Sequence, residues 1–199
     1  MISDKFVILG FLINLFGDLS YVLHTLQNKT KPNRVSWFMW ALAPLIAFSA
    51  EIHEHVGIQV LMTFIVGFGP LMVFIASFVN RKSVWKLTRF DLACGALSLL
   101  GLILWLLTRH GNVAIFFSIL ADGLAAIPTV VKSYKDPGSE SYLVFLLGAT
   151  NAAITLLTID HWNFATYGFP IYIFSICILL FVLIRFKAGV VLGKRFGNT

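Results

Sequence analysis

Seven long apolar runs, separated by short polar segments, make up almost the whole chain. A run of about 20 apolar residues is long enough to cross the hydrocarbon core of a bilayer. Lipid offers no partners for backbone N–H and C=O groups, and a closed barrel would show shorter alternating segments, so the runs predict helices. The predicted spans are residues 6–26, 35–50, 58–79, 91–108, 113–133, 141–159 and 165–186.

The ends of two spans need comment. The first run follows Lys5, is too long for a signal-peptide core and lacks a small-residue cleavage site, so we expect a retained membrane span. The second run is short, and the pattern leaves its end near Glu51 open. We expect no long loop and no further domain in the sequence.

Basic residues are concentrated in alternate connections of this seven-span arrangement. Thirteen of the 15 Lys and Arg residues fall on one side: Lys29, Lys31, Arg34, Arg81, Lys82, Lys86, Arg89, Lys132, Lys135, Arg185, Lys187, Lys194 and Arg195. The other side holds Lys5 and Arg109 together with Asp4, Glu51, Glu54 and Asp160. The excess of positive charge predicts an integral, multi-pass protein with its N-terminus outside and its C-terminus in the cytoplasm.

Composition agrees with membrane insertion. Hydrophobic residues make up 58% of the 199 residues and charged residues 12%, about half of the roughly 25% that is usual in soluble domains. The mean hydropathy is +0.87. These values exclude a soluble enzyme, a disordered chain and a disulfide scaffold. The net charge of +6 follows from membrane orientation and does not indicate a nucleic-acid partner. Cys94 and Cys177 lie in apolar runs, which predicts free buried thiols.

The chain contains a weak internal repeat with an offset of about one hundred residues. The matching pairs are 14–18 with 118–122, 29–32 with 134–137, Ser36-Trp37 with Ser141-Tyr142, and Pro70 with Pro170. Span four stands outside the repeat, and Ser98 is its only hydroxyl between positions 92 and 107. We therefore predict an all-α membrane protein with a 3+1+3 parallel repeat: a three-helix bundle at 1–90, a lipid-facing linker helix at 91–112, and a second bundle with a short cytoplasmic tail at 113–199.

Two segments of this repeat resemble a known motif. Residues 128–141, Pro-Thr-Val-Val-Lys-Ser-Tyr-Lys-Asp-Pro-Gly-Ser-Glu-Ser, look like a PQ-loop, and residues 24–36 look like a degenerate first copy. Thr25 and Thr129 stand where that motif has Gln, and His24 replaces the first Pro. The chain thus resembles the PQ-loop and SWEET superfamily of small-solute transporters. The resemblance implies the 3+1+3 fold and transport of a sugar, amino acid or vitamin by alternating access.

Two acidic residues lie in the middle of predicted spans, at equivalent places of the repeat. Burying a carboxylate at the bilayer centre costs about 2.5–3.5 kcal/mol, so Asp18 and Asp122 are candidates for function. If the two bundles face each other, burial and like charge both favour proton binding there. The two residues are therefore predicted to bind substrate and to couple transport to protons, with a purely structural hydrogen-bonding role as the alternative.

Polar residues follow the two aspartates at helical spacing. Asn14, Asp18, Tyr21 and Thr25 share one helix face, and the face of Ser118 and Asp122 repeats it. These stripes predict a shared cavity, or else polar contacts between packed helices. Asn151 lies mid-span and is predicted either to bind solute or to bond a neighbouring backbone.

Aromatic and proline residues complete the candidate site. Trp40 is predicted to line the cavity, whereas Trp37, three residues from Arg34, is predicted to lie at the membrane interface. Prolines interrupt four spans, where they act as hinges for alternating access or as static kinks. These prolines are Pro44, Pro70, Pro128 and Pro170.

Other classes of protein lack support in the sequence. The segment His53-Glu54-His55, with Glu51, is predicted to be a solvated outer loop and not a metal site. The chain has no mid-depth Lys in span seven for retinal, no Walker loop and no nucleophile elbow. We predict no enzyme activity, no catalytic residue, no cofactor and no metal. The predicted partners are a small solute and the bilayer, and the oligomeric state stays open. The alternative is a cargo receptor or interaction protein on the same fold.

Overall fold

The computed structural model describes residues 2–80, 85–108, 111–189 and 191, and this part of the chain is all-helical. Its seven α-helices are α1 Phe6–Leu26, α2 Arg34–His53, α3 Val60–Val79, α4 Arg89–Thr108, α5 Gly111–Lys135, α6 Tyr142–Leu157 and α7 Phe164–Arg185, with a short 3-10 turn, η1 Pro137–Ser139. Each α-helix lies on one predicted span. Five of them, α1, α2, α3, α5 and α7, are long and apolar enough to cross a membrane, whereas α6 is a shorter apolar helix of 16 residues.

Side-chain caps fix two of the helix starts. The Asn33 side chain accepts hydrogen bonds from the backbone of Val35 and Ser36, which starts α2. Asn163 and Thr166 form a reciprocal capping box at the start of α7. The second span runs three residues beyond its predicted end. Glu51 therefore lies in the last turn of α2 and is only 2% exposed, so its placement in a solvated outer loop was wrong.

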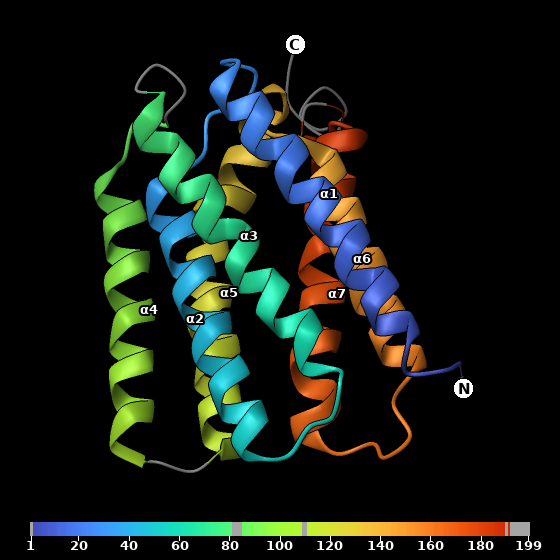
Figure 1. The fold of residues 1–199 in the computed structure, drawn as a ribbon. Coiled ribbons are helices and arrows are strands. Elements are labelled where there is room, and N and C mark those ends of the chain that lie inside the picture. The colour runs from blue at the N-terminus through green and yellow to red at the C-terminus, as the bar shows by residue number, and fades with distance from the viewer. Residues whose placement is uncertain (1, 81–84, 109–110, 190, 192–199) are drawn as a thin grey trace.

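Six helices form a closed ring, and the seventh packs outside it (Figure 1). The order of contacts around the ring is α1, α3, α2, α5, α7, α6 and back to α1. Sequence neighbours α1 and α2 are separated by α3, and α5 and α6 are separated by α7 in the same way. Helix α4 packs against α5 and α2. The ring order thus places α1 beside α6 and α2 beside α5.

The two ends of the bundle differ in charge. The α1–α2 and α5–α6 connections and the end of α7 lie together at one end, at the top of Figure 1. This basic end holds Lys29, Lys31, Arg34, Lys86, Arg89, Lys132, Lys135, Arg185 and Lys187. The opposite end holds Asp4, Lys5, Glu54 and Asp160. Five basic residues lie outside the described residues: Arg81, Lys82, Arg109, Lys194 and Arg195.

The outer surface is apolar, whereas many interior side chains are polar. On α1, Leu12, Phe16, Leu19 and Leu23 are exposed at steps of one helical turn. The opposite face of the same helix buries Asn14, Asp18, Tyr21 and Thr25. Helix α4 likewise exposes Leu92, Leu97, Leu99, Leu100 and Ile103. An apolar exterior around a polar interior is typical of a helix bundle in lipid.

Candidate solute-binding site

A small cavity lies inside the six-helix ring, and every helix of the ring contributes to its wall. The centre of a water molecule can occupy about 60 Å³ of it, enough for a few water molecules. Two acidic and three aromatic side chains give the wall its chemical character. Together with one amide they are Asn14, Asp18, Trp37, Trp40, Asp122 and Phe145.

Asp18 and Asp122 enter this cavity from α1 and α5. Each is 2% exposed, and each accepts a hydrogen bond from a neutral group. The Asn14 side chain donates to Asp18 Oδ2 at 2.7 Å, and the Tyr172 hydroxyl donates to Asp122 Oδ2 at 2.5 Å. The indole N–H of Trp40 donates to the backbone carbonyl of Asp122 at 3.3 Å, which fixes this aromatic ring beside the second carboxylate. Both predicted carboxylates thus line one cavity.

A glycine in α3 makes room for the first carboxylate. A Cβ atom added at Gly69 would overlap the Asp18 carboxylate, so this residue has to be glycine for α1 and α3 to pack as they do. Pro70 follows directly and also lines the cavity. The backbone of α3 at Gly69 therefore packs directly against Asp18, and a larger residue at this position would displace the Asp18 side chain.

We expect Gly69→Ala to lower the melting temperature in detergent, because overlap with a packed polar side chain costs about 1–3 kcal/mol. Gly123→Ala in α5 is the matched control, since its added Cβ would make an ordinary contact with Tyr172 at 3.7 Å. Alanine is also the better helix former by about 0.8–1 kcal/mol. A thermal melt should therefore show Gly69→Ala well below Gly123→Ala. Equal melting temperatures would contradict the packing of Asp18 against α3.

The predicted amide and hydroxyl residues take different places. Asn14 lines the cavity and accepts a hydrogen bond from Asn151 Nδ2 at 3.4 Å. Asn151 itself packs against Gly10, where an added Cβ would lie 2.5 Å from Asn151 Oδ1, so this amide joins α6 to α1 behind the cavity wall. Ser118 is fully buried and is not among the described residues of the cavity wall.

The four predicted hinge prolines are buried inside their helices: Pro44 in α2, Pro70 in α3, Pro128 in α5 and Pro170 in α7. Among the described residues of the cavity wall, Pro70 is the one member of this set. A role in motion stays a prediction for all four.

Trp37 lies in the cavity wall and does not face the outside of the bundle. Its side chain is 1% exposed and packs against Tyr21, with ring centroids 4.5 Å apart, and against Trp40 at 5.4 Å. The prediction of an interfacial belt residue was therefore wrong. Arg34, one turn earlier, points instead to the neighbouring helix α3, where it donates to the Ser77 carbonyl at 2.6 Å.

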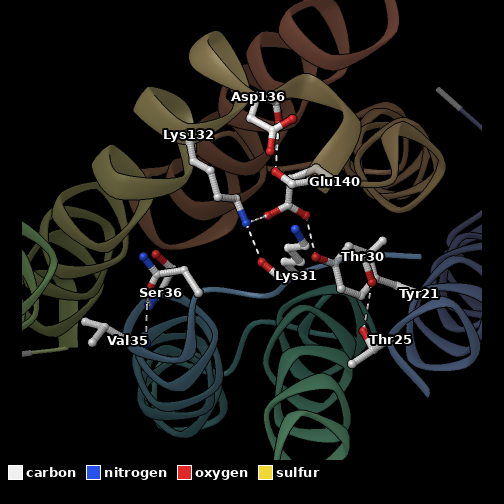
Figure 2. Close-up of polar contacts among 11 residues, drawn as sticks. Tyr21, Thr25, Thr30, Lys31, Val35, Ser36, Lys132, Asp136 and Glu140 are labelled. Atoms are coloured by element: carbon white, nitrogen blue, oxygen red, sulfur yellow. Dashed lines mark hydrogen bonds and ion pairs between the residues drawn. The ribbon is translucent and has the colours of Figure 1, made fainter. Parts of the chain in front are cut away.

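A buried polar cluster that the sequence did not predict lies at the basic end, next to Tyr21 (Figure 2). We call it the Lys132 cluster; it consists of Tyr21, Lys132, Glu140 and the Lys31 carbonyl. Lys132 forms an ion pair with Glu140, and the Tyr21 hydroxyl donates to the same carboxylate. Lys132 Nζ also donates to the Lys31 carbonyl at 2.7 Å. The cluster joins α1, the α1–α2 connection, α5 and the segment before α6.

Lys132, one of the thirteen basic residues on the predicted cytoplasmic side, is only 1% exposed. The sequence contains one indication of this burial: two valines precede the lysine, so the apolar run extends as far as Lys132. The pairing with Glu140 depends on the turn at Pro137–Ser139, which folds the chain back over the end of α5. The hydrophobic pattern of the sequence does not predict how that turn folds.

An apolar cluster separates the cavity from a second hollow at the opposite end. Its buried core includes Met62, Ile115 and Phe169. It reaches from Ile173 in the cavity wall to Val56 and Ala165, which line the second hollow. The rim of that hollow carries Asp4, Glu54, His55, Asp160 and His161. No group of three His, Cys, Asp or Glu residues in the described part of the chain is placed to hold a metal ion.

No family model, no curated protein and no solved structure matches this chain.

Proposed function

We propose that the protein is a PQ-loop or SWEET-like transporter that moves a small polar solute, such as a sugar, an amino acid or a vitamin, across a membrane by alternating access. The observation that supports this most is a cavity that all six helices of the ring line, with Asp18 and Asp122 in its wall. Fold analogy alone does not assign a function, so the proposal depends on this site.

Helix packing supports the 3+1+3 repeat within this proposal. Under a two-fold axis along the membrane normal, α1 corresponds to α5, α2 to α6 and α3 to α7. The contact of α1 with α6 then corresponds to the contact of α5 with α2, and both are present. The third helix lies between the first two in each set. Helix α4 would be the linker that lets both sets cross in the same direction.

Two barriers on either side of the cavity support alternating access. On the side of the basic end, the Lys132 cluster contacts the cavity wall through Tyr21 and Trp37. Toward the opposite end, the apolar cluster around Met62 and Phe169 reaches from the wall residue Ile173 to the second hollow. A carrier needs one barrier to open while the other stays closed. Buried prolines in α2, α3, α5 and α7 weaken the backbone ladder where such bending would occur.

Uptake into proteoliposomes tests the proposal. Purified protein would be reconstituted, and radiolabelled glucose, glutamine, lysine, thiamine and choline would each be offered outside, with protein-free liposomes as the blank. We expect saturable uptake of at least one solute above the blank. Saturable binding in detergent without uptake of any of them would contradict transport and favour the receptor alternative.

The proposed orientation gives a separate prediction. In a variant whose two native cysteines are replaced by alanine, Asp160→Cys marks the opposite end and Lys135→Cys marks the basic end. We expect a membrane-impermeant maleimide to label Asp160→Cys in intact cells and Lys135→Cys only after permeabilisation, because the basic end faces the cytoplasm. The reverse pattern of labelling would contradict the orientation.

A further inference from the structure

The charge balance of the cavity wall is unusual for a buried site. Asp18 and Asp122 are each 2% exposed, and their hydrogen-bond donors, Asn14 and Tyr172, are neutral. None of the described residues that line the cavity is Lys, Arg or His. Among the described residues, Lys132 is the one buried basic side chain, and it is already paired with Glu140. The wall therefore holds acidic groups whose charge is balanced by no protein cation.

One carboxylate oxygen has no protein partner in the described part of the chain. Asp122 Oδ2 accepts from Tyr172, whereas Asp122 Oδ1 is buried and accepts no hydrogen bond from any described residue. Leaving a buried acceptor without a donor is unfavourable, because the oxygen gives up its hydrogen bonds to water and gains none in the protein. A ligand that donates a hydrogen bond or brings positive charge to this oxygen would recover that cost.

The rest of the wall suits a cation with an apolar surface. Trp37 and Trp40 lie nearly perpendicular, with ring centroids 5.4 Å apart, and Phe145 stands edge-on to Trp40 at 6.2 Å. Aromatic faces attract cations through their quadrupole, and tryptophan does so best. Apolar side chains such as Val144, Ile173 and Leu180 exclude water from the same space. The wall thus combines negative charge with aromatic faces.

We infer that the solute of this cavity is a small monovalent organic cation, which binds between Asp18, Asp122 and the two tryptophans. This inference rests on the proposed function, because it names the substrate class of the same site. The cation takes the place of a proton on the carboxylates, so proton and cation compete. Among the described residues, Cys177 on α7 is the other titratable group of the wall, and the lining residues of α2, α3 and α6 are not titratable. The wall is also contacted by Tyr172 on α7, which bonds Asp122, and by Tyr21 on α1, which packs against Trp37 and bonds Glu140 of the Lys132 cluster.

Matched pairs of ligands test the charge requirement directly. Guanidinium and urea share one planar shape, and choline and 3,3-dimethylbutanol share another, but only the first of each pair is charged. We expect calorimetric titration, at concentrations far below those that denature proteins, to show saturable binding of at least one cation and about tenfold or weaker binding of its neutral partner. Binding of the cation should weaken as the pH falls. Equal affinity within both pairs, or cation binding that does not change with pH, would overturn the inference.

Variants locate the site. We expect Asp122→Asn to weaken cation binding about tenfold to a hundredfold, because a hydrogen bond to a charged group is lost. Glu54→Gln, at the opposite end, should leave binding unchanged; full binding by Asp122→Asn would overturn the assignment to this cavity. The ligand pairs and the pH series need only the unaltered chain, so they decide the question if a variant does not fold.

The uptake screen separates this inference from the proposed function. Uptake of glucose without binding of either cation would overturn the cation assignment and leave transport standing. Cation binding without uptake would leave the assignment standing and overturn transport.

Discussion

We expect Lys132→Met to lower the free energy of unfolding by about 3–5 kcal/mol, because removing one partner of a buried ion pair leaves the other charge without compensation. Lys132 is 1% exposed, and the Glu140 side chain with which it pairs is fully buried. The substitution also removes the donor to the Lys31 carbonyl. Denaturant titration in detergent micelles measures the loss, and the melting temperature should fall with it.

Two further variants show whether the loss comes from the ion pair. Lys135→Met removes an exposed charge one turn along α5 and should change stability by no more than about 0.5 kcal/mol. The double variant Lys132→Met with Glu140→Gln should recover most of the loss, because the amide still accepts the Tyr21 hydrogen bond while no unpaired charge remains. Equal stability of Lys132→Met and Lys135→Met would show that the pair contributes little to folding.

The second large effect concerns transport. We expect Asp18→Asn and Asp122→Asn each to abolish uptake driven by a pH gradient and to reduce downhill uptake about tenfold or more, because the amide neither binds a proton nor carries charge. Each carboxylate is buried among neutral groups. Proteoliposome uptake at several pH values on both sides of the membrane measures both effects for the solute that the screen identifies.

Stability separates this functional loss from misfolding. A buried carboxylate without a basic partner is costly, so the asparagine variants should melt at the same temperature as the unaltered chain or higher. Asp160→Asn, an exposed acid at the opposite end, should change neither uptake nor its pH dependence. Unchanged uptake and pH dependence in both Asp18→Asn and Asp122→Asn would contradict the role proposed for the carboxylates.

The sequence predicted the helices well because hydrophobic runs and membrane thickness set their positions almost alone. Span one, Phe6–Leu26, coincides with α1, and the ends of the other helices differ from their predicted positions by no more than three residues. The largest difference is at the end of α2, where it changes the predicted environment of Glu51. Apolar content falls at Glu51, but the helix continues to His53 because this carboxyl group is buried in the packed bundle. Hydropathy alone does not predict this end of α2, because it does not show that Glu51 is packed inside the bundle.

The candidate site was predicted only in part, because the sequence does not show in which direction every side chain points. Repeat matching and helical spacing led to Asp18 and Asp122, and the structure brings both to one cavity. Hydropathy and helical spacing do not show which way a residue near a helix end points. Trp37 was therefore predicted at the membrane interface, and the burial of Lys132 was not predicted, although both side chains are buried. Burial of such residues involves contacts between segments distant in sequence, such as Lys132 Nζ with the Lys31 carbonyl. Only the folded chain contains those contacts.

Alternating access is the central claim, and counterflow tests it most directly. Proteoliposomes would be loaded with an excess of the unlabelled solute that the uptake screen identifies, and the labelled solute would be added outside without any pH difference. A carrier with one site that faces each side in turn should take up label faster than empty vesicles do, and should concentrate it transiently. Equal uptake by loaded and empty vesicles would contradict alternating access through this cavity.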